Sequence, residues 1–126
     1  MKIDYEELLA GKDVLVAEDN DSNYMLLKYM LKNVSLDRAY DGVEAVEKAM
    51  GKKYGIILMD MRMPRMGGLE ATRKIREFDQ MIPIVAVTAN AFDSDKEDAF
   101  EAGCNGFIAK PVSKENLTKV LKEVMS

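Results

Sequence analysis

Several side chains that could do chemistry each come directly after a short apolar run. They are Glu18, Asp19, Asp60, Thr88 and Lys110. Any one of them alone could be an ordinary solvated loop residue, because loops lie on the surface. Their repeated placement after apolar runs indicates a shared site instead. Three carboxylates, a hydroxyl and an ammonium group suit the binding of a hard cation together with an anionic group.

The apolar runs predict the strands of a parallel sheet. They occupy residues 14–17, 56–59, 82–87 and 107–109. These runs are apolar at almost every position rather than at alternate positions, which is typical of strands covered on both faces. The mixed run at 36–40 is weaker, as expected for an edge strand, and ends in no obvious site residue.

The segments between these strands show the periodicity of amphipathic helices. Apolar side chains recur at i, i+3, i+4 and i+7 from Leu27 to Val34 and again from Leu117 to Val124. Three further helices are expected between Asp41 and Gly51, through Ala71 and Ile75, and up to Gly103. The alternation amounts to five βα units, which predicts an α/β doubly wound parallel sheet with helices on both faces. We assign residues 1–12 to an N-terminal extension and residues 13–126 to one domain.

Such a sheet would bring the carboxylates together. The carboxyl ends of parallel strands meet at one edge, where binding crevices form. Two carboxylates about 4 Å apart repel each other by about 4 kcal/mol at an effective dielectric constant of about 20. Oxygen ligands without histidine or cysteine favour Mg²⁺. Three carboxylates, Mg²⁺ and Lys110 would sum to zero charge. The cluster could then admit a phosphoryl group, with Asp60 as nucleophile and Thr88 as a hydrogen-bond donor.

Composition narrows the class of protein. The chain has 126 residues, the size of one domain, and its net charge of −4 offers no general attraction to nucleic acid. It contains no histidine, which excludes Ser/His/Asp catalysis and imidazole zinc sites. The single cysteine, Cys104, favours a reducing, cytoplasmic setting. We expect no membrane contact by this domain, because its apolar runs are too short to span a bilayer.

Four motifs together resemble the receiver domain of two-component response regulators. They are Val-Leu-Val-Ala-Glu-Asp-Asn at 14–20, Leu-Met-Asp-Met-Arg-Met-Pro-Arg-Met-Gly-Gly at 58–68, Thr-Ala-Asn at 88–90 and Lys-Pro at 110–111. The resemblance runs from about Leu9 to Leu121. It implies a flavodoxin-like fold with strand order 2-1-3-4-5. The segments 9–16 and 69–76 are most similar to receivers attached to hybrid sensor kinases.

The resemblance implies a role for each residue that matches a motif. The implied Mg²⁺ ligands are the carboxylates of Glu18, Asp19 and Asp60 and the backbone carbonyl of Arg62. Asp60 would also be the phosphoacceptor, with Thr88 and Lys110 binding the phosphoryl group. Thr88 and Phe107 would form the switch. Phe107 stands where the family often has tyrosine, so a contact that needs that hydroxyl is missing.

The same resemblance implies a signalling switch rather than an enzyme that acts on a separate substrate. Phosphoryl transfer to the domain and its later loss would be self-catalysed. The implied donor is a phosphohistidine on a histidine kinase or histidine phosphotransfer domain. The sequence does not indicate the downstream effector.

Three other functions remain alternatives. Aspartyl-nucleophile phosphatases combine similar groups, but they carry Asp-x-Asp after the first strand, whereas Arg62 follows Asp60 by two positions here. A flavin-binding module would hold a phosphate near the first loop, which Glu18 and Asp19 would repel. A degenerate receiver could act as a docking module alone, although all the reactive positions are filled.

Overall fold

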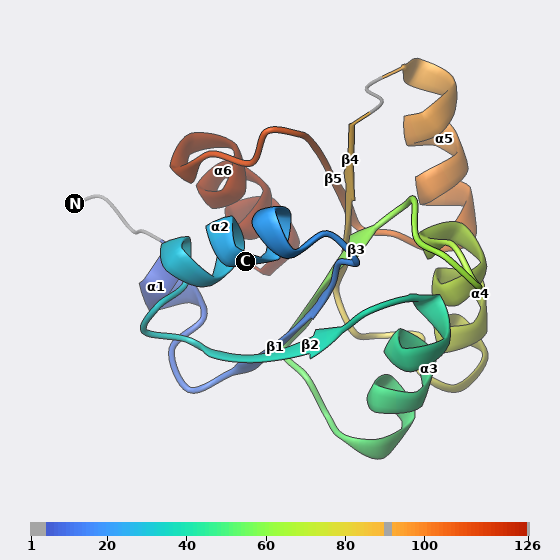
Figure 1. The fold of residues 1–126 in the computed structure, drawn as a ribbon, viewed down its shortest axis with the longest axis horizontal. Coiled ribbons are helices and arrows are strands. Elements are labelled where there is room, and N and C mark those ends of the chain that lie inside the picture. Colours follow the sequence, from blue (N-terminus) through green and yellow to red (C-terminus); the bar gives the residue numbers. More distant parts are fainter. Residues whose placement is uncertain (1–4, 90–91, 126) are drawn as a thin grey trace.

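A parallel five-stranded sheet lies between two layers of helices in the computed structural model (Figure 1). The structure describes residues 5–89 and 92–125. The strands are β1 (Asp13–Ala17), β2 (Ser35–Ala39), β3 (Ile56–Asp60), β4 (Ile84–Thr88) and β5 (Gly106–Ala109). Their order is β2-β1-β3-β4-β5 and every neighbouring pair is parallel. The predicted order and the edge position of the second strand are confirmed.

The helices form two layers, one on each face of the sheet. They are α1 (Tyr5–Leu8), α2 (Asp21–Met30), α3 (Gly42–Gly51), α4 (Gly68–Phe78), α5 (Asp93–Ala102) and α6 (Lys114–Met125). In Figure 1, α1, α2 and α6 lie on one side of the sheet, and α3, α4 and α5 lie on the other. The doubly wound α/β class is therefore confirmed. Among the described residues, no helix combines the length and apolar character that crossing a membrane requires.

Successive residues of the central strands supply two separate cores. In β1, Val14 and Val16 face the core beneath α1, α2 and α6, while Leu15 and Ala17 face the core beneath α3, α4 and α5. All four are at most 1% exposed. Burial on both faces explains why the central strands are continuously apolar in the sequence. It also fixes the register, because a shift by one residue would exchange the two faces.

Some element boundaries differ from those that the sequence predicts. The apolar stripe predicts a helix through Val34, but α2 ends at Met30 and the fully buried Leu31 caps it. The helix ends early because the chain turns there to enter β2 at Ser35. The fourth strand begins at Ile84 rather than residue 82, after Pro83, which has no N–H to donate. Asn90 lies outside the described residues.

The segment at 5–12, before β1, packs against the domain. Helix α1 contacts α6, and Leu9 is 2% exposed within the core beneath α1, α2 and α6. The Lys12 N–H donates to the Leu9 carbonyl at 3.0 Å, and the Asn33 amide donates to Glu6 Oε2 at 3.2 Å. This segment therefore contributes to the core that positions β1.

Replacing Leu9 with alanine should lower the free energy of unfolding by about 2–4 kcal/mol, since it removes a buried leucine and leaves a cavity. Urea denaturation followed by circular dichroism measures the change. Leu26→Ala is a matched control, because Leu26 is 42% exposed and its truncation should cost much less. Equal effects of the two variants would show that Leu9 does not contribute to the folded core.

Candidate metal and phosphoryl site

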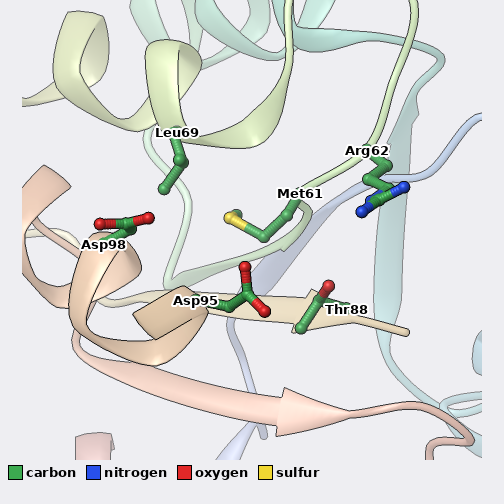
Figure 2. Close-up of a pocket in the computed structure, with 6 residues that line it drawn as sticks. All are labelled: Met61, Arg62, Leu69, Thr88, Asp95 and Asp98. Carbon is green, nitrogen blue, oxygen red and sulfur yellow. The ribbon is translucent and has the colours of Figure 1, made fainter. Parts of the chain in front are cut away.

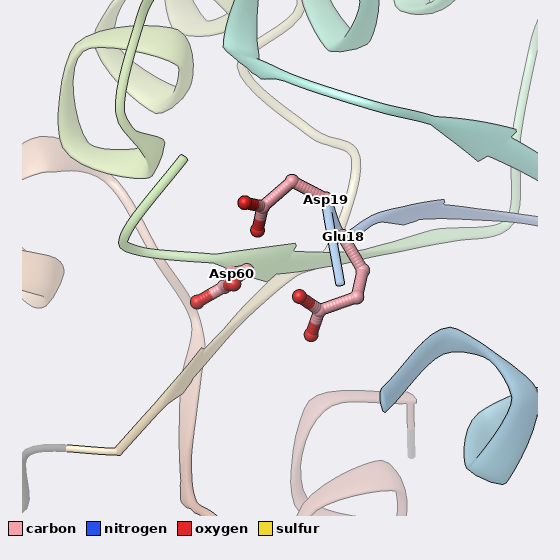
Figure 3. A group of neighbouring side chains, drawn as sticks. All are labelled: Glu18, Asp19 and Asp60. Atoms are coloured by element: carbon pink, nitrogen blue, oxygen red, sulfur yellow. The ribbon is translucent and has the colours of Figure 1, made fainter. Parts of the chain in front are cut away.

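Three carboxylates gather beyond the ends of β1 and β3. One carboxylate oxygen from each of Glu18, Asp19 and Asp60 lies within 4.8 Å of the others (Figure 3). Glu18 and Asp60 are 2% and 5% exposed, whereas Asp19 is exposed. The expectation that these side chains converge at one sheet edge is confirmed. Because Asp19 is exposed, the cluster reaches solvent on that side.

Backbone hydrogen bonds hold the loop that carries the acidic pair. The Glu18 N–H donates to the Ala39 carbonyl at 3.0 Å, which extends the pairing of β1 with β2. The Asn20 N–H donates to Glu18 Oε2 at 3.2 Å, and the Asn20 side chain caps α2 by accepting from the Asn23 N–H at 2.9 Å. The start of α2 therefore fixes the direction of the Glu18 carboxylate.

Lys110 bridges two of the three carboxylates. Its Nζ lies 3.1 Å from Glu18 Oε1 and 3.4 Å from Asp60 Oδ2, and its side chain is 19% exposed. The Lys110 N–H donates to the Thr88 carbonyl at 2.7 Å, so the position of the lysine depends on the end of β4. One ammonium group thus faces two buried carboxylates, with a third nearby.

The charge of this cluster is only partly balanced. Burial, and then the neighbouring Asp60, raise the pKa of Glu18, while Lys110 and the Asn20 N–H act in the opposite direction. Three acids against one lysine leave a net negative site into which a divalent cation fits by charge. All the donors are oxygens, and an exposed third ligand leaves room for water. The donor set therefore fits Mg²⁺.

The loop after β3 wraps around Asp60. The Arg62 N–H donates to Asp60 Oδ1 at 3.2 Å, and the Gly68 N–H donates to the Met61 carbonyl at 3.1 Å. A side chain at position 68 would overlap the backbone carbonyl of Asp60, so glycine is required for this close approach. The loop thereby supplies one hydrogen bond to the candidate acceptor and keeps its backbone in place.

A second set of contacts ties this loop to α3. The Asp41 side chain caps α3 by accepting from the Glu44 N–H at 2.9 Å, and it also accepts from Arg65 Nε at 2.6 Å. Arg65 holds the pKa of Asp41 below its usual range. Arg65 adopts a left-handed conformation (φ 64°), and the Gly42 N–H donates to the Met66 carbonyl at 3.0 Å. These bonds anchor the far end of the loop.

Thr88 lines a cavity next to the carboxylate cluster. The cavity has a volume of about 150 Å³, and Met61, Arg62, Leu69, Asp95 and Asp98 also line it (Figure 2). Thr88 is 3% exposed, while the Arg62 side chain is exposed. Asp95 and Asp98 reach the cavity from α5, opposite Met61 (Figure 2). The space is large enough for a small movement of the Thr88 side chain.

Phe107 lies on the same face of the sheet as Thr88. It pairs with Ala86 in the register of β4 and β5, two residues before Thr88. Its side chain is half-buried and packs against the core beneath α3, α4 and α5. The fold therefore places both candidate switch residues next to the same layer of helices.

The second strand contributes a polar residue that no sequence motif indicates. Arg38 of β2 donates from Nε to the backbone carbonyl of Glu18 at 3.1 Å, so β2 does supply a polar residue to the site. The expectation concerned the end of this strand, and Arg38 lies one position before that end, at Ala39. No motif marks Arg38 as a neighbour of Glu18, because that contact is with a backbone atom. The pair of Asp41 and Arg65 was also missed, and a capping aspartate before a helix is the only signal that indicates it.

Comparisons with known proteins identify the family. A family model for the response regulator receiver domain matches residues 14–122. The sensor kinase/phosphatase LuxQ of Vibrio vulnificus is 41% identical over 110 residues, which is 85% of this chain and 13% of LuxQ. The chain therefore belongs to the response regulator receiver domain family. It spans only about an eighth of the length of this relative.

Solved structures agree with this assignment. One similar structure is the receiver domain of the sensor histidine kinase PA1611 from Pseudomonas aeruginosa, solved with a magnesium ion in its active-site cleft. It is 37% identical to this chain with a TM-score of 0.84, and the match covers 93% of this chain and all of that one. The receiver domain of Ssk1 from Saccharomyces cerevisiae, solved with the histidine phosphotransfer protein Ypd1, is 31% identical with a TM-score of 0.82, covering 89% of this chain and 88% of that one. The chain is also similar to the hybrid signal transduction histidine kinase L of Dictyostelium discoideum, which is 36% identical over 125 residues, or 91% of this chain and 7% of that protein.

Crowding of the carboxylates predicts that Asp60→Asn stabilises the metal-free protein. The substitution removes a like charge but keeps an oxygen that can accept from the Arg62 N–H, so the free energy of unfolding in chelator should rise by about 1 kcal/mol. Urea denaturation in the presence of EDTA measures it. Asp98→Asn, an exposed acid outside the cluster, should change stability by less than about 0.5 kcal/mol. A lower urea midpoint for Asp60→Asn than for the wild type would contradict repulsion among the carboxylates.

Proposed function

We propose that this domain accepts a phosphoryl group on Asp60 from a phosphohistidine and thereby switches its affinity for a partner. The observation that carries the proposal is the convergence of Glu18, Asp19 and Asp60, with Lys110 Nζ between two of them. A nucleophilic carboxylate beside a cation site and an ammonium group is an arrangement suited to phosphoryl transfer.

In the proposed transfer, a carboxylate oxygen of Asp60 forms a bond to phosphorus. The bond between phosphorus and the donor imidazole nitrogen breaks, and the imidazole leaves with the electron pair. Glu18, Asp19, Asp60 and the Arg62 carbonyl would hold Mg²⁺, which when bound supplies positive charge to the phosphoryl oxygens. Lys110 would turn toward a phosphoryl oxygen, and the Thr88 hydroxyl would donate to another. Attack of water on the acyl phosphate would later release phosphate and restore the carboxylate.

The proposed donor is a histidine kinase or a histidine phosphotransfer domain. The chain has no histidine of its own, so a phosphohistidine donor must lie on another protein or domain. The complex of the similar Ssk1 receiver with Ypd1 supports this class of donor.

We also propose a cytoplasmic location, because the one cysteine, Cys104, is a buried free thiol of the kind that reducing compartments preserve. Residues 13–126 would form the receiver proper.

The proposed switch follows from the placement of Thr88 and Phe107. Movement of Thr88 toward a phosphoryl group on Asp60 would open space on the face of the sheet that Phe107 shares. Phe107 would turn inward, and the surface formed by α5, β5 and α6 would change its affinity for a partner. The phosphoryl group would thus shift a population between two packings.

Incubation with acetyl phosphate and Mg²⁺ should add one phosphoryl group to the wild-type chain and none to Asp60→Asn. Intact mass spectrometry measures the adduct. Glu77→Gln, an exposed acid on α4 outside the cluster and the cavity, is the matched control and should be modified like the wild type. An unmodified wild type would support a docking-only receiver, and steady release of phosphate by multiple turnover on other phosphate esters would favour a phosphatase.

A phosphoryl mimic should move Phe107 as well as Thr88. Addition of beryllofluoride and Mg²⁺ should shift the amide resonances of β5 and of α5 near the cavity, because both switch residues change their packing. Thr88→Ala should still bind the mimic but lose the shifts at β5. Unchanged resonances at Phe107 in the wild type would reject the switch while leaving phosphorylation of Asp60 intact.

A further inference from the structure

Arg38 connects the edge strand to the acidic loop. Its Nε donates to the backbone carbonyl of Glu18 at 3.1 Å, and its Nη2 lies 2.9 Å from Asp21 Oδ1 in the first turn of α2. The arginine side chain is 12% exposed although it sits on the edge strand. One guanidinium therefore contacts the chain on both sides of Asp19.

Two tyrosine rings contact the guanidinium of Arg38. The Arg38 Cζ lies 4.4 Å from the ring centroid of Tyr24 and 4.1 Å from that of Tyr40. Tyr24 belongs to α2, and Tyr40 directly follows β2. Contact with two aromatic rings suits the planar guanidinium and restricts its movement, and a lysine ammonium could not reproduce it together with the directed Nε–H bond.

We propose that Arg38 is a positioning residue of the metal site, which sets the backbone of Glu18 and Asp21 so that the Glu18 and Asp19 carboxylates face Asp60. This inference rests on the proposed magnesium site. The loop between Glu18 and Asp21 carries two of the three acids, whose repulsion would otherwise push it outward. Groups behind the ligands of a metal commonly orient those ligands, and their loss weakens binding.

The positive charge of Arg38 alone predicts the opposite effect on Mg²⁺ affinity, which makes the inference testable. A positive side chain close to the acids should oppose the entry of Mg²⁺, so its neutralisation should strengthen binding. If Arg38 acts by holding the acidic loop in place, its neutralisation should weaken Mg²⁺ binding instead. Arg38→Lys adds a second distinction, since it keeps the charge and loses the planar, directed guanidinium.

The experiment titrates MgCl₂ at constant ionic strength into the wild type, Arg38→Gln and Arg38→Lys, and follows the amide resonances of the acidic loop. Both variants should bind Mg²⁺ about tenfold more weakly than the wild type. Arg76→Gln is the matched control, because Arg76 also donates from Nε to a backbone carbonyl, that of Gly103 at 3.0 Å, on the other side of the sheet. It should lose stability without a change in the dissociation constant for Mg²⁺.

A second readout needs no metal. Hydrogen exchange of the Asn20 amide, which donates to Glu18 Oε2, should speed up in chelator for both Arg38 variants and stay unchanged for Arg76→Gln. Tighter Mg²⁺ binding by Arg38→Gln, or wild-type affinity in both Arg38 variants, would overturn the positioning role. Unchanged Asn20 exchange would overturn it as well. A wild-type chain that binds no Mg²⁺ would instead refute the magnesium site itself, and the exchange rates would still decide the role of Arg38.

Discussion

Repulsion among buried carboxylates is the constraint on which the site depends. Glu18 and Asp60 are almost fully buried, share one ammonium group and stand beside the exposed Asp19. In water such a cluster would separate. It persists because the acidic pair follows β1 while Asp60 ends β3, so the free energy of folding holds the charges together. The same repulsion is the basis for the proposed binding of a divalent cation and, once the charge is neutralised, of a phosphoryl group.

The fold supplies rigidity where the charges meet. The acidic pair follows β1 and is held by β2 and the start of α2, while Asp60 ends β3 and is enclosed by a loop anchored to α3 through Asp41 and Arg65. Lys110 takes its place from the end of β4. The cavity beside Thr88 is the adjustable part, since it leaves space between α4 and α5 on the face that Phe107 shares. A phosphoryl-driven switch requires a fixed cluster of charges next to side chains whose packing can change.

Periodicity and residue type were sufficient to predict the sheet, its two helical layers and the meeting of the carboxylates. These features follow from burial on both faces of the strands and from parallel topology. Resemblance supplied the strand order, which no local pattern contains. The early end of α2 and the contact from Arg38 could not be predicted, because both depend on where separate elements pack in space. The Arg38 contact involves a backbone carbonyl, so no pairing of side-chain types indicates it.

The central claim is tested most directly by the free energy of unfolding of the wild-type chain as a function of Mg²⁺ concentration, with KCl keeping the ionic strength constant. If the cation relieves the repulsion, stability should rise from its value in EDTA along a one-site saturation curve and then increase with the logarithm of concentration. A stability that does not depend on Mg²⁺, or that rises equally when KCl alone is added, would contradict the account.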